Sequence, residues 1–169
     1  MHKISLADIF KLSSETLNAA KAKGVTIAVA ESCTGGLIGA ALTSIDGSSA
    51  CFHGGIIAYA NSVKTKLLGV SPSVLGKYGA VSEKTAQRMA AGAVERLGVD
   101  IAVSVTGVAG PGGGTDEKPV GTVWIGIARR EDGKVVATAT LHNFGDIGRN
   151  KVRDVTCYEA LKALKAACV

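Results

Sequence analysis

The residues best suited to chemistry stand together where a predicted buried strand runs straight into a predicted helix. Val25 to Ala30 is short, apolar and partly β-branched, which favours a buried strand. The polar run Ser32-Cys33-Thr34 follows, and Leu37 to Leu42 resumes the apolar spacing of a helix. Open α/β sheets bind ligands beyond the carboxyl ends of their strands, and a helix N-terminus offers backbone N–H groups to an anion. We therefore predict that Ser32 is a nucleophile.

A serine hydroxyl is a weak nucleophile unless a base accepts its proton. The chain has three histidines, His2, His53 and His142, and none stands in a partner motif. The residues around Ser32 do not form the GxSxG turn of α/β-hydrolases. These features disfavour a Ser-His-Asp triad and leave lysine as the alternative base, which burial must keep neutral by lowering its pKa.

Lys64 is a candidate for this base because it follows Tyr59 and Asn61 at a predicted strand-to-helix junction. Tyr59 would hold the lysine or relay a proton. Spacing alone favours a simpler interpretation, in which Lys64 and Lys66 form a solvated helix face. Cys33 is a rival nucleophile, which we rank second because no histidine is in view to make its thiolate.

Two further patterns are suited to binding an anion. The loop Gly107 to Gly114 is rich in glycine, and its N–H groups can cradle an oxyanion or a phosphate, although it matches neither a Walker A loop nor GxGxxG. A flexible surface loop is the alternative. Arg149 and Arg153 share one face of a predicted helix, where guanidinium groups suit phosphate or carboxylate; a solvated basic face is the alternative.

Composition limits the class of protein. The chain has 169 residues, of which 47% are hydrophobic and 22 are glycine, which predicts one domain over residues 1–169. No apolar run approaches the roughly 20 residues of a membrane span, and the start does not resemble a signal peptide, so we expect a cytoplasmic protein without a membrane partner. Four cysteines lack the spacing of a metal site, and we expect free thiols and no bound metal.

Charge and aromatic content indicate the partner. The net charge is +5, but only 4% of residues are aromatic and the basic residues are spread along the chain. Stacking platforms for nucleic acid are therefore scarce, and we expect a small substrate that carries a phosphate rather than a nucleic acid. We also expect a homo-oligomer, as is common among small enzymes.

Interleaved helices and strands predict an α/β protein, a three-layer α/β/α sandwich with a mixed, mostly parallel central sheet and an antiparallel hairpin. Asn61 and Ser71 are expected to cap helices. The predicted helices are Leu6 to Lys23, Leu37 to about Thr43, Ser62 to Leu68, one opened by Ser71-Pro72, Ser82 to Leu97 and Asp146 to Ala167. The predicted strands are Val25 to Ala30, Cys51 to Tyr59, Ile101 to Val105, Gly121 to Ala128 and Lys134 to His142.

Taken together, the motifs resemble the CinA C-terminal domain family, whose stand-alone members include nicotinamide-nucleotide amidases. The resemblance covers nearly the whole chain. The matching stretches, in the family's order, are AESCTGG (Ala30 to Gly36), DGSSACF (Asp46 to Phe52), Tyr59-Ala60-Asn61 with Lys64, GAVSE (Gly79 to Glu83), TGVAGPGGGT (Thr106 to Thr115), KPVGTVW (Lys118 to Trp124) and Arg149 to Arg153. The run Gly145 to Arg149 departs from the family's Gly-Asp-Arg by two intervening residues.

This resemblance implies an amidohydrolase that converts nicotinamide mononucleotide to nicotinic acid mononucleotide and ammonia in pyridine-nucleotide salvage, without a cofactor. It implies that Ser32 is the nucleophile, Lys64 the base and Tyr59 a catalytic-site residue. Many family members carry this domain behind a molybdopterin-binding-like domain, whose activities are not carried over here. The expected substrate-binding residues are Glu31, Cys33, Thr34, Gly35, Gly36, Ser48, Asn61, Thr106, Gly107, Ala109, Gly110, Arg149 and Arg153.

Two other interpretations stay open at this point. One is a non-catalytic competence- or damage-linked domain that binds a ligand or DNA. The other is an amidase with the same site and a different small amide as its substrate. A neutral, buried Lys64 would favour an enzyme, whereas a salt-sensitive affinity for DNA would favour the binding domain.

Overall fold

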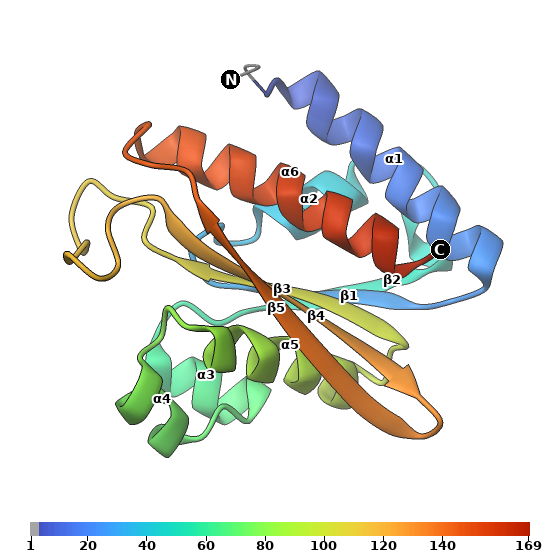
Figure 1. Cartoon of the computed structure of the whole chain (residues 1–169). Helices are drawn as coiled ribbons and strands as arrows, with labels where there is room; N and C mark the ends of the chain where they lie inside the picture. The colour runs from blue at the N-terminus through green and yellow to red at the C-terminus, as the bar shows by residue number, and fades with distance from the viewer. Residues whose placement is uncertain (1–3) are drawn as a thin grey trace.

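The structure is a computed structural model that describes residues 4–169. Helices and strands alternate early in the chain, and a β-hairpin and a long helix complete it (Figure 1). The helices are α1 (Leu6–Lys23), α2 (Leu37–Thr43), α3 (Asn61–Leu68), α4 (Pro72–Tyr78), α5 (Glu83–Leu97) and α6 (Arg149–Ala167), with a short 3-10 helix at Ser48–Ala50. The strands are β1 (Ile27–Glu31), β2 (Phe52–Ile57), β3 (Ile101–Gly107), β4 (Thr122–Glu131) and β5 (Lys134–Asn143). The elements match those predicted from the sequence, with ends displaced by a few residues.

Capping groups in the sequence explain where the helices begin and end. Ser5 accepts a hydrogen bond from the Asp8 backbone N–H at 3.2 Å, and the Asp8 carboxylate accepts one from the Ser5 N–H at 2.8 Å. Gly24, in the left-handed conformation at φ +70°, ends α1. Ser71 and Ser82 cap α4 and α5 through bonds to the backbone N–H three residues on, which confirms both predicted starts.

The five strands form one mixed sheet in the order β2-β1-β3-β4-β5. Strand β1 pairs in parallel with β2 and β3, whereas β4 pairs antiparallel with β3 and β5. Helices α1, α2 and α6 cover one face, and α3, α4 and α5 cover the other (Figure 1). The predicted three-layer α/β/α arrangement is therefore confirmed. Because β1 lies between two parallel neighbours, its carboxyl end opens at an edge where β2 and β3 also end.

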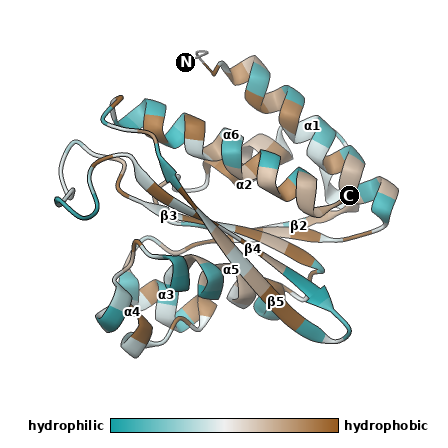
Figure 2. Cartoon of the chain, in the orientation of Figure 1, coloured by the Kyte–Doolittle hydropathy of each residue, from teal (hydrophilic) through white to brown (hydrophobic). Residues whose placement is uncertain are grey.

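Strand β1 lies between the two layers of helices and contributes side chains to both cores. All five of its residues are buried. Ile27 and Val29 join the core beneath α1, α2 and α6, and the alternate residues Ala28 and Ala30 join the core around α5. Figure 2 shows the matching amphipathic pattern on α1 and α6, where brown and teal turns alternate. The strand that leads to Ser32 is thus held rigidly from both sides.

Helix α3, which carries Lys64, is packed closely on α5. Gly92 of α5 lies against the backbone carbonyl of Leu68, where any Cβ atom would collide with it. The start of α3 differs from the prediction. Ala60, with extended backbone, precedes the helix, and Asn61 is its first helical residue rather than its cap, without a capping hydrogen bond.

No helix among residues 4–169 is long and apolar enough to cross a membrane.

Candidate active site

Ser32 directly follows the last residue of β1. Its backbone N–H donates to the Val105 carbonyl of β3 at 3.1 Å, so the strand pairing continues up to the serine itself. The residue is only 8% exposed. Its hydroxyl is therefore fixed at the carboxyl end of the parallel strands, where the sequence predicted a site.

Lys64 reaches this serine from α3. Its Nζ lies 3.1 Å from Ser32 Oγ, 2.8 Å from the Ala58 carbonyl oxygen and 3.1 Å from the Tyr59 carbonyl oxygen. The residue is 1% exposed, and no carboxylate among residues 4–169 forms a salt bridge with it. Burial disfavours the ammonium and holds the pKa of Lys64 below its usual value.

These contacts determine where the proton-accepting lone pair of Lys64 points. A carbonyl oxygen can only accept a hydrogen bond, so Ala58 and Tyr59 take the two N–H bonds of a neutral amine. The remaining lone pair then faces Ser32, whose hydroxyl can donate. A neutral Lys64 in this position can take the proton of Ser32, and the solvated helix face suggested by spacing alone is wrong for Lys64.

Cys33 lacks the environment of a nucleophilic thiolate. Cys33 is buried, and burial raises the pKa of its thiol to about 12. Neither His53 nor His142 lines the pocket at Ser32, and His2 lies outside the described residues. At neutral pH Cys33 is therefore a protonated thiol, which is a weaker nucleophile than a thiolate.

A cavity of about 200 Å³ opens beside Ser32 and Lys64. Thr106 at the end of β3 helps to form it, since its hydroxyl donates to the Ala80 carbonyl at 2.7 Å and ties β3 to the loop before α5. Ala80 and Val81 were not predicted as site residues. They lie in the GAVSE stretch, which has no reactive side chain where it meets the cavity. The lining residues are Ser32, Cys33, Tyr59, Lys64, Ala80, Val81, Thr106, Gly107, Ala109 and Arg149.

Tyr59 and Arg149 form the rim of this cavity. Arg149 donates to the Tyr59 hydroxyl at 3.1 Å and to the Gly110 carbonyl at 2.7 Å. We expected the Tyr59 side chain to hold Lys64, but its phenol contacts Arg149 instead. The backbone carbonyl of Tyr59 is the group that accepts a hydrogen bond from Lys64. Arg149 is the first residue of α6, and it lines the cavity.

Arg153 has a different position from Arg149 although both belong to the first turns of α6. It donates to the Thr34 carbonyl at 2.9 Å and is not among the lining residues. The Thr34 hydroxyl points to the Glu31 carboxylate, at 2.6 Å. The direct substrate-binding roles expected of Arg153 and Thr34 are therefore not supported, and both residues instead brace the turn after Ser32.

The amino end of α2 is not free to bind a substrate, contrary to the sequence-based expectation. The Glu31 carboxylate accepts hydrogen bonds from the backbone N–H groups of Gly36, Ile38 and Gly39 at 2.8 to 3.1 Å. The Gly35 N–H donates to the Ser32 carbonyl at 3.1 Å. Glu31, Gly35 and Gly36 thus serve the local structure and do not line the cavity.

Ser48 and Asn61 are also absent from the lining of the cavity. Ser48 precedes β2, so it lies at the amino end of the parallel strands, whereas Ser32 lies beyond their carboxyl end. Asn61 is exposed at the start of α3. Gly110 contributes only its carbonyl to Arg149. Within one copy of the chain, the structure does not bring these three residues to Ser32.

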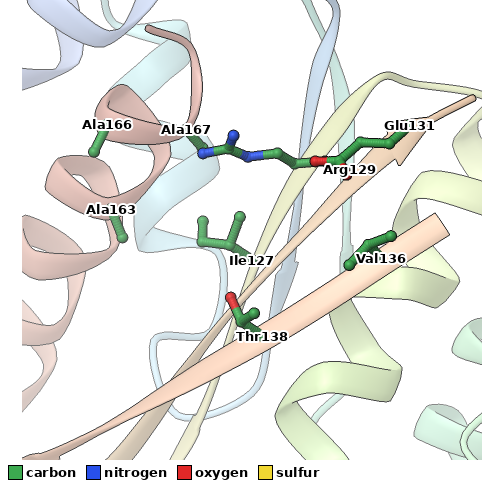
Figure 3. Close-up of a pocket in the computed structure, with 8 residues that line it drawn as sticks. All are labelled: Ile127, Arg129, Glu131, Val136, Thr138, Ala163, Ala166 and Ala167. Atoms are coloured by element: carbon green, nitrogen blue, oxygen red, sulfur yellow. The ribbon is translucent and has the colours of Figure 1, made fainter.

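A larger groove, of about 340 Å³, lies elsewhere, between α6 and the β4–β5 hairpin. Figure 3 shows alanines of α6 on one side, Ile127 and Thr138 on the other, and the Arg129 side chain extending from β4 toward α6. It contains no nucleophile beside a base, and none of the expected site residues lines it. Its lining residues are Ile127, Arg129, Glu131, Val136, Thr138, Ala163, Ala166 and Ala167.

The family assignment rests on nearly the whole length of the described fold. The sequence model of the protein family described as the CinA C-terminal domain matches residues 9–168. The chain belongs to this family. Among solved CinA-family structures, the competence/damage inducible protein CihA from Agrobacterium tumefaciens is 45% identical, with a TM-score of 0.88 over 94% of each chain. A CinA superfamily protein from Escherichia coli is 32% identical, with a TM-score of 0.86 over 98% of this chain and 94% of that one.

Curated CinA relatives differ in length. A CinA-like protein of Chlorobaculum tepidum is 52% identical over 84% of this chain, but the match covers 34% of that protein. This chain therefore spans about a third of such relatives. A protein from Enterobacter agglomerans, named nicotinamide-nucleotide amidohydrolase PncC, is 54% identical over 82% of this chain and 83% of its own length.

Proposed function

We propose that this CinA-family chain is an amidohydrolase that converts nicotinamide mononucleotide to nicotinic acid mononucleotide and ammonia through a Ser32 acyl-enzyme. The observation that carries the proposal is the buried amine of Lys64, 3.1 Å from the Ser32 hydroxyl and with carbonyl oxygens as its two other partners. The PncC relative, which matches over most of both lengths, supports the choice of substrate.

Acylation begins with the neutral amine of Lys64. It accepts the Ser32 proton while Oγ attacks the carboxamide carbon, and the carbonyl π electrons move to oxygen to form a tetrahedral oxyanion. The resulting ammonium of Lys64 retains hydrogen bonds to the Ala58 and Tyr59 carbonyls. These fixed dipoles compensate part of the cost of a charge in a buried site.

Collapse of the oxyanion breaks the C–N bond. The ammonium of Lys64 gives its proton to the leaving nitrogen, which departs as ammonia, and the amine is neutral again. It next takes a proton from a water molecule that attacks the Ser32 ester. The same ammonium then returns a proton to Oγ as nicotinic acid mononucleotide leaves, so Lys64 acts as base and acid in both halves of the reaction.

The oxyanion needs a hydrogen-bond donor near Ser32. The backbone N–H groups of Gly35 and Gly36 are bonded to Ser32 and Glu31 and cannot serve. Cys33 lines the cavity, and its N–H donates to no other residue among residues 4–169. We assign the oxyanion to this N–H.

The nucleotide part of the substrate must bind at the rim of the cavity, because the carboxamide occupies its base. Arg149 is the cation that lines the rim, and it can exchange its hydrogen bond to the exposed Tyr59 phenol for one to phosphate. Guanidinium groups suit phosphate because two N–H donors can bind two oxygens. We propose that Arg149 binds the phosphate and that Tyr59 packs beside the ribose or the pyridine ring of the substrate.

Ammonia release from nicotinamide mononucleotide tests this function. The wild type, Ser32→Ala, Lys64→Met and Lys66→Met would be assayed with EDTA present, and circular dichroism would confirm that each is folded. Lys66 is the matched control because it lies exposed on the same helix. Turnover by the wild type and Lys66→Met only is expected. Full activity of Ser32→Ala would contradict the assignment of the nucleophile, and an inactive, folded wild type would contradict the substrate.

A further inference from the structure

Glu31 makes an unusual set of contacts for an acidic residue next to a nucleophile. It is 1% exposed, and its carboxylate accepts four hydrogen bonds. The donors are the Thr34 hydroxyl (2.6 Å) and the backbone N–H groups of Gly36 (3.0 Å), Ile38 (3.1 Å) and Gly39 (2.8 Å). No lysine or arginine among residues 4–169 forms a salt bridge with it. All of its partners belong to the next eight residues of the chain.

These bonds join the end of β1 to the start of α2. Gly36 precedes α2 and has no side chain to cap it, so the N–H groups of Ile38 and Gly39 need acceptors from elsewhere in the chain. Glu31 supplies these acceptors from the strand, and its negative charge lies at the positive end of the helix dipole. Because both ends of the segment are held, residues 32–35 must form a compact turn, which the Gly35 N–H to Ser32 carbonyl bond closes.

Two backbone N–H groups after the nucleophile donate to no other described residue, and one of them lies at the cavity. The Gly35, Gly36 and Leu37 N–H groups all have acceptors within the turn. Among residues 4–169, the N–H groups of Cys33 and Thr34 donate to no other residue, and of these two only Cys33 lines the cavity with Ser32. The carboxylate thus binds the N–H groups of the helix start without using the one adjacent to the reacting serine.

We infer that Glu31 is a positioning residue, which holds the Ser32–Gly35 turn so that the Cys33 N–H meets the oxyanion. This inference rests on the proposed amidase function. It assigns no substrate contact to Glu31, and it predicts that Glu31 acts on the transition state alone. An interaction made only in the transition state lowers kcat when it is lost and leaves KM unchanged.

The test is Glu31→Gln, which keeps the size of the side chain. An amide has one acceptor oxygen and one NH2 group, and the NH2 group would face an N–H donor that the carboxylate now satisfies. We expect kcat to fall by about 10- to 100-fold with KM within about twofold of the wild type, since loss of an oxyanion donor costs about 10²–10³-fold and the turn is displaced rather than removed. Ser5→Ala, which removes the cap of the distant helix α1, is the matched control for loss of stability and is expected to keep wild-type kcat.

A second readout separates this inference from the identity of the substrate. A fluorophosphonate labels an activated serine through a transition state that also places charge on oxygen, and peptide mapping identifies the labelled residue. Glu31→Gln is expected to label Ser32 more slowly than the wild type by a similar factor. If the wild type is labelled but does not hydrolyse nicotinamide mononucleotide, the substrate proposal fails and the inference on Glu31 is still tested. Wild-type kcat and labelling rate in folded Glu31→Gln, or a raised KM with unchanged kcat, would overturn the inference.

Discussion

Replacing Lys64 by arginine tests whether a neutral amine is required at Ser32. Arginine keeps the positive charge and can still donate to the Ala58 and Tyr59 carbonyls, so a purely electrostatic role would survive the substitution. A guanidinium does not lose its proton in proteins, because its pKa lies above about 12. Lys64→Arg therefore removes the lone pair that faces Ser32 while it retains the charge.

The expected loss follows from the role of the lysine. A positioned general base contributes about 10²- to 10⁴-fold to the rate, and we expect kcat/KM of Lys64→Arg to fall by that factor. In the wild type, kcat/KM should rise about tenfold per pH unit while the amine is mostly protonated, and then level off. Because burial lowers the pKa of Lys64, the midpoint should lie below about 10.4, the usual value for lysine.

The assay is ammonia release at limiting substrate from about pH 6 to about pH 10, with Lys66→Arg as the matched surface substitution. The rising limb is expected for the wild type and Lys66→Arg, and it should be absent in Lys64→Arg. A wild-type midpoint at or above the usual lysine value, or a Lys64→Arg enzyme with wild-type kcat/KM, would refute the reasoning that Lys64 acts as the base.

Three further outcomes are expected. Burial lowers the pKa of Lys64 in the folded state but not in the unfolded chain, so the wild-type free energy of unfolding should rise with pH between the folded pKa and about 10.4. Urea titrations at several pH values should show this rise for the wild type and not for Lys64→Met. The same pH dependence of stability in both proteins would contradict the prediction. Burial raises the pKa of the Cys33 thiol to about 12, so Cys33→Ala should retain activity within a few fold of the wild type. Iodoacetamide should leave Cys33 unmodified near neutral pH, and rapid alkylation of Cys33 would instead indicate a thiolate. Gly92→Ala should lower the free energy of unfolding by about 1–3 kcal/mol, because the added Cβ would push α3 away from α5. Chemical denaturation measures this change, and an unchanged stability would contradict the prediction.

Local sequence signals carry most of the information on the fold. Ser71 and Ser82 cap their helices as predicted, because an N-cap depends on the few residues that follow it. The hairpin was predictable from Asp132-Gly133, which both adopt positive φ (+48° and +77°), as a two-residue turn between strands requires. These elements need no knowledge of distant contacts.

The chemistry of the site depends on contacts that local patterns do not encode. By spacing, Lys64 resembles Lys66, and only the packing of α3 against the rest of the fold makes one buried and the other exposed. Family resemblance indicated the role of Lys64, whereas helical periodicity did not. Glu31 shows the opposite case: its neighbours predicted a substrate contact, but β1 is buried on both faces, so no alternation of polar and apolar residues revealed that its carboxylate points to α2.

The central claim is that Ser32 forms a covalent acyl intermediate with the help of Lys64, and intact-protein mass spectrometry of acid-quenched reactions with nicotinamide mononucleotide tests it most directly. The account predicts a nicotinoyl-nucleotide adduct that peptide mapping locates on Ser32 and that is absent from Ser32→Ala and Lys64→Arg. An adduct on Cys33, or steady turnover by Ser32→Ala, would contradict it.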